Sequence, residues 1–276
     1  MVKSNTLTVV AADVEKPGPY DDRADQAAPR RPKLVVTLGR GKTGKTIWLR
    51  WVAETAARSR PLRIIDADPN NQALARYFSE AELPPSVDGE DKRAWIEAQM
   101  NDIMEAAGDN ARRYDLLLDV GGNDQLLRRL GKEVQIADVL EGEGVDPVAV
   151  HMLGPDDDDL RYLEDVENNN LFRPKATVLV VNAGLVPPTS DFTIAFGRVL
   201  RSEIVQRVTS PERGGRLVVM PALGCMREFE SLGIPSFRAA LRDDGPSKIG
   251  RLNCVRIRNW LREMEGVRAT LADLLP

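Results

Sequence analysis

The sequence predicts an α/β fold, a three-layer α/β/α sandwich with a mostly parallel central sheet. Short apolar segments alternate along most of the chain with segments of helical periodicity, and this alternation is typical of a parallel sheet covered by helices on both faces. A glycine-rich loop, Gly39–Thr46, joins the first apolar segment to the first amphipathic one. Such sheets bind ligands at the carboxyl ends of their strands, so the loop lies where this fold places its ligand site.

The predicted strands are short and mostly apolar. Leu34–Leu38 opens the core, and its continuous apolar run is typical of a strand buried on both faces. The second and third strands, Arg63–Asp66 and Leu116–Leu118, each lead to an aspartate. Further strands are predicted at Val148–Leu153, Thr177–Val181 and Arg216–Met220.

The predicted helices repeat apolar residues at helical spacing. The clearest covers residues 92–107, where the apolar positions are Trp95, Ile96, Met100, Ile103 and Met104. Residues 45–58 predict a helix directly after the glycine-rich loop. The remaining helices are predicted at Gln72–Phe78, Ser190–Val208, Pro235–Arg242, Leu252–Glu265 and Arg268–Leu275.

Length and composition favour one large domain. The chain has 276 residues, of which 42% are hydrophobic and 29% charged, and this is enough to bury a sizeable core. Residues 1–31 combine several prolines with many charged and small residues. We therefore predict a flexible N-terminal arm over 1–31 and a single domain over 32–276 with a helical C-terminal portion. Within the arm, the apolar run Leu7–Ala12 is either an edge strand or part of a disordered start.

The composition argues against several classes of protein. With a net charge of -4 the chain is too acidic to bind nucleic acid over its whole surface, so any DNA contact needs a local patch. Cys225, Cys254 and His151 do not form the closely set group that a structural zinc site needs, and we interpret them as packing positions. No apolar run approaches the roughly 20 residues of a membrane span, and no secretory signal is recognisable. We expect a cytoplasmic protein.

The glycine-rich loop carries the strongest functional signal. It matches the pattern G-x-x-x-x-G-K-[ST] in full, with Gly39, Arg40, Gly41, Lys42, Thr43, Gly44, Lys45 and Thr46. The glycines let backbone N–H groups point at phosphate oxygens, and the helix that follows directs its positive end at the same anion. Lys45 can reach the β- and γ-phosphates, and Thr46 can bind Mg²⁺. The match predicts ATP binding, and the alternative is a chance glycine-rich turn.

Aspartates follow the second and third predicted strands. Asp66-Ala67-Asp68-Pro69 ends the second, and Asp119 ends the third. Carboxylates at the ends of buried strands are costly unless they are paired or metal-bound, so Asp66 and Asp119 are predicted to face Mg²⁺. Gly122 can offer its backbone N–H to the γ-phosphate. Asp68 has an alternative explanation as the cap of a helix that starts near residue 70.

These segments together resemble the ParA/MinD group of deviant Walker ATPases, from about Lys33 to Leu241. The loop of that group reads K-G-G-x-G-K-[ST] and its second motif reads D-x-D-P, as Asp66–Pro69 does. Tyr114-Asp115 is similar to the start of its Walker B strand. The later segments that are similar to the group are Val178–Asn182 and Val218–Pro221, followed by Glu228, Gly233 and Pro235.

The resemblance implies a P-loop NTPase fold and a homodimer that forms on ATP. It also implies ATP hydrolysis that is slow until a partner protein, not identified by the sequence, stimulates it. By the group's pattern, Lys45 and Thr46 bind the phosphates and Mg²⁺ and Asp68 orients the attacking water. The remaining carried-over roles are Mg²⁺ support by Asp66 and Asp119, and adenine contacts by Asn182 and Pro221.

The chain departs from the group at the first lysine of K-G-G-x-G-K-[ST], the signature lysine, which in the group reaches across the dimer interface to the partner's ATP. In this chain Arg40 occupies the position of that lysine, and Lys42 occupies the position of the second glycine. Arginine is always charged and can act as a finger on the γ-phosphate. Either Arg40 or Lys42 would then supply the charge that crosses the dimer interface.

The group's known roles suggest a cellular task. ParA-like proteins move plasmids or chromosomal origins over nonspecific DNA, and relatives act in conjugative transfer. Two groups of basic residues could form a DNA patch, although an ordinary solvated helix surface is the alternative. They are Lys248, Arg251, Arg256, Arg258, Arg262 and Arg268, and separately Arg198, Arg201 and Arg207.

Other charged segments are interpreted without a ligand. Membrane-bound relatives carry a basic amphipathic helix at the C-terminus, whereas this chain ends in Leu271–Pro276 with an acid and few basic residues nearby, so no membrane partner is expected. The run Asp156–Asp159 is interpreted as a helix N-terminus rather than a metal site.

Three functions stay open on the sequence. The first is a partition- or transfer-type ATPase that dimerises on ATP and binds DNA. The second is a metabolic ATP-dependent enzyme on the same fold, which needs a small-molecule pocket beside the γ-phosphate. The third is a regulatory scaffold that binds nucleotide with little turnover.

Overall fold

The fold was analysed in a computed structural model that describes residues 30–56, 60–68, 72–85, 89–121, 125–187, 189–242 and 244–276. The chain divides into two units, Met1–Arg30 and Arg31–Pro276, and all elements below belong to the second. The run Leu7–Ala12, and all but the last two residues of the predicted arm, lie outside the described residues. The predicted domain division therefore stays a prediction.

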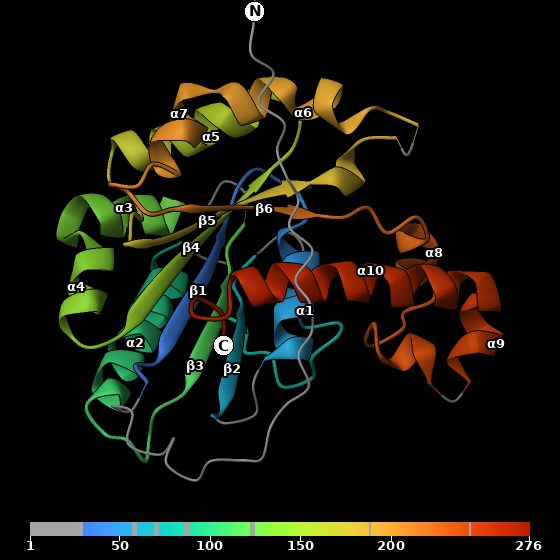
Figure 1. Cartoon of the computed structure of the whole chain (residues 1–276). Coiled ribbons are helices and arrows are strands. Elements are labelled where there is room, and N and C mark those ends of the chain that lie inside the picture. The colour runs from blue at the N-terminus through green and yellow to red at the C-terminus, as the bar shows by residue number, and fades with distance from the viewer. Residues whose placement is uncertain are drawn as a thin grey trace, which may run out of the picture. The chain divides into compact units, whose positions relative to one another are not determined.

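The described strands form one six-stranded sheet in the order β2-β3-β1-β4-β5-β6, and every neighbouring pair is parallel. This confirms the predicted parallel α/β fold (Figure 1). Each predicted strand is present, with ends shifted by at most two residues. The strands are β1 Lys33–Leu38, β2 Leu62–Asp66, β3 Asp115–Asp119, β4 Asp146–Leu153, β5 Ala176–Asn182 and β6 Arg216–Met220.

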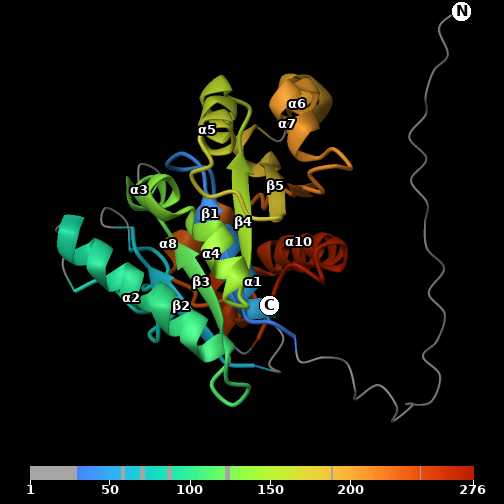
Figure 2. The same ribbon diagram turned by 90° about the vertical axis from the view of Figure 1, so that its left-hand side faces the viewer.

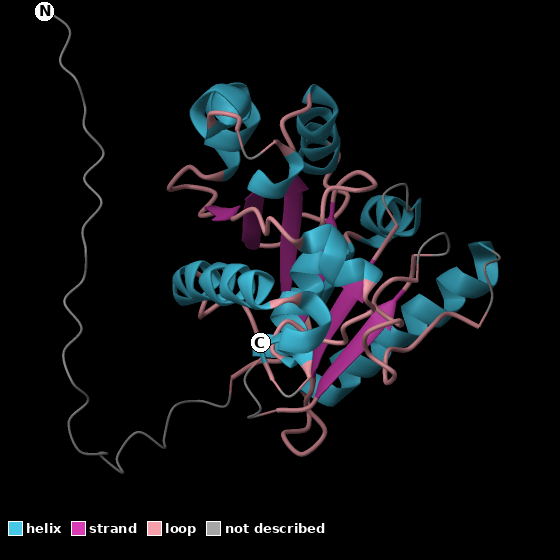
Figure 3. Ribbon diagram, turned by 90° about the vertical axis from the view of Figure 1, so that its right-hand side faces the viewer, coloured by secondary structure: helices cyan, strands magenta, loops and turns pink. Residues whose placement is uncertain are grey.

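Helices cover both faces of the sheet, as Figures 2 and 3 show from opposite sides. One face packs against α1 (Lys45–Thr55) and the C-terminal helices α8 (Met226–Ser231), α9 (Gly245–Ile249) and α10 (Arg251–Thr270). The other face packs against two groups. The first is α2 (Gly89–Ala107), α3 (Gln125–Val134) and α4 (Ile136–Gly142), and the second is α5 (Asp157–Asn168), α6 (Phe192–Arg201) and α7 (Glu203–Val208). Short 3-10 turns occur at η1 (Ala183–Leu185) and η2 (Ala239–Leu241).

The register of the central strands places three polar side chains in one row. Thr37 of β1 lies opposite Asp119 of β3, and Asp119 lies opposite Asp66 of β2. Directly paired residues of parallel strands point to the same face. All three therefore lie on the α1 face, near the carboxyl end of the sheet.

Five of the predicted helices differ from the structure. Gln72–Phe78 forms turns, because the Ala75 N–H donates to the carboxylate of Asp66 at 3.1 Å instead of continuing a helix. Residues 235–242 form only the 3-10 turn η2, since the N–H groups of Phe237 and Arg238 donate to Glu54 of α1.

The other three differ in where a helix breaks. Ser190–Val208 is two helices, because the extended backbone at Ser202 ends α6 and its hydroxyl caps α7. Leu252–Glu265 and Arg268–Leu275 were predicted as two helices, but α10 runs unbroken through Gly266 to Thr270. Helices α3, α4, α8 and α9 were not predicted. Helix α5 does begin within the acidic run Asp156–Asp159, as expected.

The C-terminal residues pack into the sheet edge. Leu271 and Leu275 are buried, and the ammonium group of Lys33 donates to the carbonyls of Asp273 and Leu275. The carboxylate of Asp273 pairs with Arg216 of β6. The described C-terminal segment is therefore part of the domain and does not form an amphipathic helix. Every helix among the described residues is too short or too polar to span a lipid bilayer.

Candidate nucleotide-binding site

The glycine-rich loop follows β1 and has a backbone that only glycine suits at two positions. Gly39 has φ +136°, and a Cβ there would lie 2.9 Å from the carbonyl oxygen of Met152. Gly44 has φ +98°, and a Cβ there would lie 2.5 Å from the side-chain nitrogen of Asn182. The loop is therefore held tightly against β4 and β5 while its other side stays open. Gly41 is exposed and has no heavy atom near its Cβ position.

The open side of the loop presents unused hydrogen-bond donors. Within the described residues, no group accepts a hydrogen bond from the backbone N–H groups of residues 41–46. These amides stand at the N-terminus of α1, where the helix dipole places partial positive charge. Several convergent amides at a helix N-terminus form a binding site for phosphate. The loop thus has the geometry that its sequence pattern predicts.

The side chain of Lys45 folds over the loop. Its ammonium group donates to the carbonyls of Gly39 and Arg40, at 3.1 and 3.0 Å. Burial lowers the pKa of the Lys45 ammonium, while the carboxylates of Asp119 and Asp68 act in the opposite direction. Within the described residues the ammonium group is therefore bonded to neutral carbonyls alone, and a phosphate can replace these acceptors with charged ones.

Asp119 lies between two threonines. The hydroxyl of Thr46 donates to one carboxylate oxygen at 2.9 Å, and that of Thr37 donates to the other at 3.2 Å. The Asp119 side chain is almost fully buried. Burial raises its pKa to about 6, and the hydrogen bond from Thr46 opposes the shift. The carboxylate at the end of β3 and the hydroxyl at the start of α1 are thus in direct contact.

These oxygens fit a magnesium ion that arrives with a nucleotide. No group of three or more His, Cys, Asp or Glu side chains arranged for a metal ion occurs in the described part of the chain. Mg²⁺, however, commonly uses one or two protein oxygens and takes the rest from phosphates and water. Asp119 and Thr46 supply such oxygens, and a cation would compensate the buried carboxylate. When bound, the ion would neutralise charge on the phosphates.

The substitution Asp119→Asn tests this assignment through pH. The folded chain binds the proton of Asp119 more tightly than the unfolded chain, whose carboxyl has a pKa near 3.8. Asp119 therefore stabilises the ligand-free fold most at low pH, and this contribution is lost as the pH rises through about 6. We expect Asp119→Asn to raise the ligand-free melting temperature at pH 7 by at least about 2 °C, and to have little effect near pH 4.

The same variant should lose the increase in ATP affinity that Mg²⁺ gives the wild-type chain. Melting curves across the pH range and calorimetric titrations with and without Mg²⁺ provide the two measurements. Parallel pH profiles for wild type and variant would show that Asp119 does not titrate in this range.

Asp66 and Asp68 have different surroundings. Asp66 is completely buried, and its two carboxylate oxygens accept N–H bonds from Asp68 at 3.4 Å and Ala75 at 3.1 Å. Burial raises its pKa. Asp66 thus anchors the chain that follows β2, and its Mg²⁺ role stays a prediction. Asp68 is half-buried, and no helix follows it in residues 72–85, so the capping explanation loses its basis.

A pocket of about 460 Å³ joins the loop to Asp68. Gly41, Lys42, Gly44, Lys45 and Thr46 form one wall, and Asp68 lies on another. The remaining lining residues are Ile47, Arg50, Ala73, Arg76, Tyr77 and Glu230. The structure therefore brings together the loop and the second acid of D-x-D-P around one cavity.

The two cations proposed to replace the signature lysine lie apart. Arg40 turns towards the start of α5, where its guanidinium lies 3.3 Å from Asp158 and 3.8 Å from both Asp156 and Asp159. It does not line the pocket. Lys42 lines the pocket, is exposed, and has φ +68°. In this ligand-free conformation Lys42, and not Arg40, is near the open amides.

Asn182 and Pro221, the two residues predicted to contact adenine, both form hydrogen bonds within the protein. Asn182 donates to the Thr43 carbonyl at 2.9 Å and accepts from the Gly184 N–H at 2.9 Å, so it supports the loop from below. The Pro221 carbonyl accepts from the indole N–H of Trp260 at 2.8 Å. Their adenine role stays a prediction. Gly122 lies outside the described residues.

Two features of the site were missed by the sequence reasoning. Thr37 supports Asp119 from the neighbouring strand, and only the register reveals it. Asp159 is buried beneath Arg40, with one carboxylate oxygen accepting from the Gly154 N–H at 3.0 Å. The acidic run Asp156–Asp159 predicted the start of a helix, but it gave no indication that its carboxylates form ion pairs with Arg40.

No protein-family model matches the sequence, and no curated protein is similar to it. Solved structures do match the fold. The MinD cell division protein of Aquifex aeolicus is 16% identical, with 84% of this chain and 97% of that one covered at a TM-score of 0.44.

McdA from Cyanothece is similar in its apo form, at 13% identity, 83% and 99% coverage and a TM-score of 0.46. The ATP complex of a single-substitution variant of Cyanothece McdA matches at 15% identity, 89% and 98% coverage and a TM-score of 0.47. At such identities and TM-scores the likeness concerns the fold alone.

Proposed function

We propose that the chain is a ParA/MinD-like ATPase that binds Mg-ATP, forms a homodimer on it, and hydrolyses it slowly until a partner protein stimulates turnover. The observation that carries the proposal is the set of open amides at residues 41–46. They lie beside Lys45 and face a pocket that also holds Asp68. A triphosphate would satisfy these donors, and Asp68 would then orient water against the terminal phosphate.

The position of Arg40 supports a dimer that depends on ATP. Its ion pairs with the start of α5 are partly exposed, and exposed ion pairs contribute only about 0–1 kcal/mol each. The carboxylate of Asp159 beneath Arg40 is buried, so the charge of a γ-phosphate, or of a partner protomer's nucleotide, must also outweigh this third pair to draw Arg40 away. Release of Arg40 would couple nucleotide binding to the surface that a second copy meets.

Nonspecific DNA binding is the next part of the proposal, and the exposed cations of α10 support it. At about 100° per residue, Arg251, Arg258 and Arg262 share one side of α10 and are exposed. Arg256 lies on another side, and Lys248 pairs with Asp244 at 2.6 Å. In the second predicted group, Arg198 pairs with Asp157 at 2.6 Å. With the resemblance, these cations favour a role in plasmid or chromosome partition or in conjugative transfer.

Sizing the chain with each nucleotide tests the proposal. We expect a monomer with ADP and a dimer with Mg-ATP, and DNA binding by the dimer that weakens steeply with salt. Arg40→Ala should still bind ATP but form less dimer, whereas Arg161→Ala, an exposed arginine that pairs with Asp158 from α5, serves as the control. Light scattering and DNA mobility shifts give the measurements. Mg-ATP binding without any change in size would contradict the dimer.

A metabolic ATP-dependent enzyme is the second candidate, because the pocket beside the loop is large enough for a small substrate. Arg76, Tyr77 and Glu230, which lie outside the loop in the sequence, also line it. An ATPase assay with and without DNA and with small carboxylate or amine substrates separates the candidates. Turnover that requires a small substrate would favour the enzyme, and binding without turnover would favour the scaffold.

A further inference from the structure

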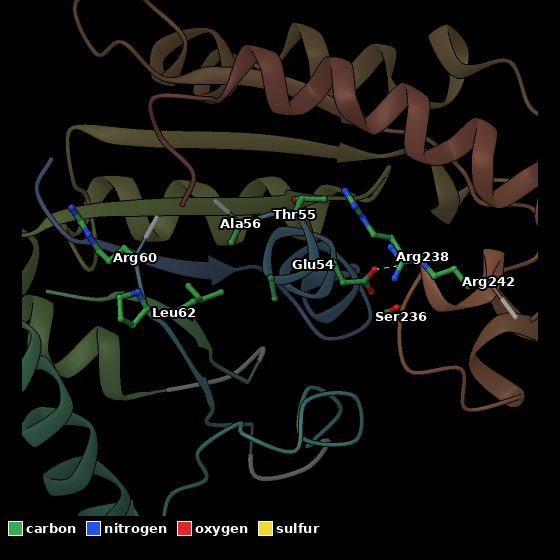
Figure 4. Close-up of a pocket in the computed structure, with 10 residues that line it drawn as sticks. Glu54, Thr55, Ala56, Arg60, Leu62, Ser236, Arg238 and Arg242 are labelled. Atoms are coloured by element: carbon green, nitrogen blue, oxygen red, sulfur yellow. Dashed lines mark hydrogen bonds between the residues drawn. The ribbon is translucent and has the colours of Figure 1, made fainter. Parts of the chain in front are cut away.

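A second system of cavities lies at the end of α1 opposite to the loop. A pocket of about 790 Å³ is bounded by the last turn of α1, residues 60–62 and residues 236–242 (Figure 4). A pocket of about 450 Å³ adjoins it between the same turn and α10. Thr55, Arg238 and Arg242 line both pockets, so the two pockets are neighbours, and together they are described as one groove.

The lining of this groove is strongly basic. Six arginines reach it from three parts of the chain: Arg60, Arg238, Arg242, Arg258, Arg262 and Arg268. We call it the arginine groove. Its acidic lining residues are Glu54 and Glu265. Such an excess of positive charge stands out on a chain whose net charge is -4, and it creates a local field that favours anions.

Several of these arginines have no anionic partner in the part of the chain that is described. Arg238, Arg242 and Arg258 are exposed, and none has a carboxylate within ion-pair distance. Glu54 cannot serve them, because its carboxylate accepts the N–H groups of Phe237 and Arg238 and pairs with Arg50. Three guanidinium groups that line the smaller pocket are therefore without an ion pair to any described residue.

The other arginines are fixed in place. Arg60 pairs with Asp115 at 3.2 Å. Arg268 donates to the hydroxyl of Thr55 at 3.2 Å and to the carbonyl of Pro276 at 2.8 Å. Figure 4 shows Arg238 and Arg242 next to each other at one end of the larger pocket, with Arg60 at the other. Arg238 and Arg242 line both pockets, whereas Arg258 lines the smaller one, which all three share.

The shape and chemistry of the groove select the kind of anion. Arginine presents a planar fork that binds two phosphate oxygens at once. Apolar side chains, including Leu241 and Leu261, line the pocket beneath the arginines, and both pocket volumes fall in the range of small-molecule sites, about 300–1,000 Å³.

We infer that the arginine groove is a second anion site, which takes a small molecule with two or more linked phosphoryl groups. It is separate from the loop, since the 11 residues of α1 span about 16 Å. The free oligophosphate and the phosphate chain of a nucleotide share this chemistry. The inference stands whether or not the loop binds ATP.

Calorimetry with inorganic tripolyphosphate tests the site in a Lys45→Ala chain, which weakens any contribution from the loop. We expect saturable binding that becomes at least about 10-fold weaker in the Arg242→Ser/Arg258→Ser variant of that chain. Arg256→Ser is the matched control, because Arg256 is exposed on the same helix but does not line the groove, and its affinity should be unchanged. A second titration, with ADP, shows whether the groove also binds phosphates that carry a nucleoside.

Other outcomes would overturn the inference. They are the absence of tripolyphosphate binding, or binding that the double substitution does not weaken. A double variant that loses affinity for a 30-base-pair duplex while tripolyphosphate gives no heat would identify the groove as a DNA surface instead. Because the substituted arginines are exposed, melting curves should show a folded variant. Arg242→Lys/Arg258→Lys keeps the charge and should restore only part of the affinity, since the fork is lost.

Discussion

Lys45→Ala is expected to abolish measurable ATP binding at micromolar concentrations, with at least a 100-fold loss of affinity. In the described part of the chain, the Lys45 ammonium is bonded only to the carbonyls of Gly39 and Arg40. It can move to the β- and γ-phosphates without breaking an ion pair. Losing one charged donor from a preorganised site costs about 10²–10³-fold. Calorimetric titration with Mg-ATP measures the effect.

Arg76→Ala is the matched control for Lys45→Ala. Arg76 is a cation that lines the same pocket from the turns after β2, and it is exposed. Its removal should change the ATP affinity by no more than about 3-fold, because an exposed charge is screened. Equal losses in the two variants would mean that the pocket attracts ATP by its overall charge. Unchanged binding by Lys45→Ala would remove the loop from the mechanism.

Asp68→Ala is expected to bind ATP normally but to lose turnover by about 10²-fold or more. Asp68 lines the pocket that the loop opens into, near enough to Lys45 for their charges to interact. A carboxylate there can orient water towards the terminal phosphate, and a positioned base contributes about 10²–10⁴-fold to a rate. It makes no contact that the phosphates need, and removal of its negative charge should if anything tighten binding. Phosphate release in a single turnover measures the step.

Glu230→Gln is the control for Asp68→Ala, since Glu230 is the other acid that lines the pocket. Its turnover should stay within about 2-fold of wild type, because Glu230 lies on α8 and, unlike Asp68, is not among the charges that act on Lys45. If Asp68→Ala hydrolyses ATP at the wild-type rate, the water-orienting role is wrong. If Glu230→Gln alone loses activity, the role belongs to α8.

Local sequence patterns were sufficient for the strands and the loop. Continuous apolar runs such as Leu34–Leu38 have few alternatives to a buried strand, and the spacing of Gly39, Gly44 and Lys45 defines the loop by itself. The aspartates that end β2 and β3 could be placed together because parallel strands end at one edge. The helix predictions failed where a hydrogen bond to a residue far away in the sequence determines the local structure. Ala75 bonds to Asp66 and Phe237 bonds to Glu54, and neither bond has a local signature.

The sequence by itself determined the parallel α/β fold, the phosphate loop and the acids at the strand ends. Each of these features is encoded by residues that are close together in the chain. Only the tertiary structure decided which distant charges meet. It placed Arg40 against the acids at the start of α5 and gathered arginines from three parts of the chain into one groove. Contacts of this kind depend on how the elements pack, since a charged side chain has no periodicity that announces its partner.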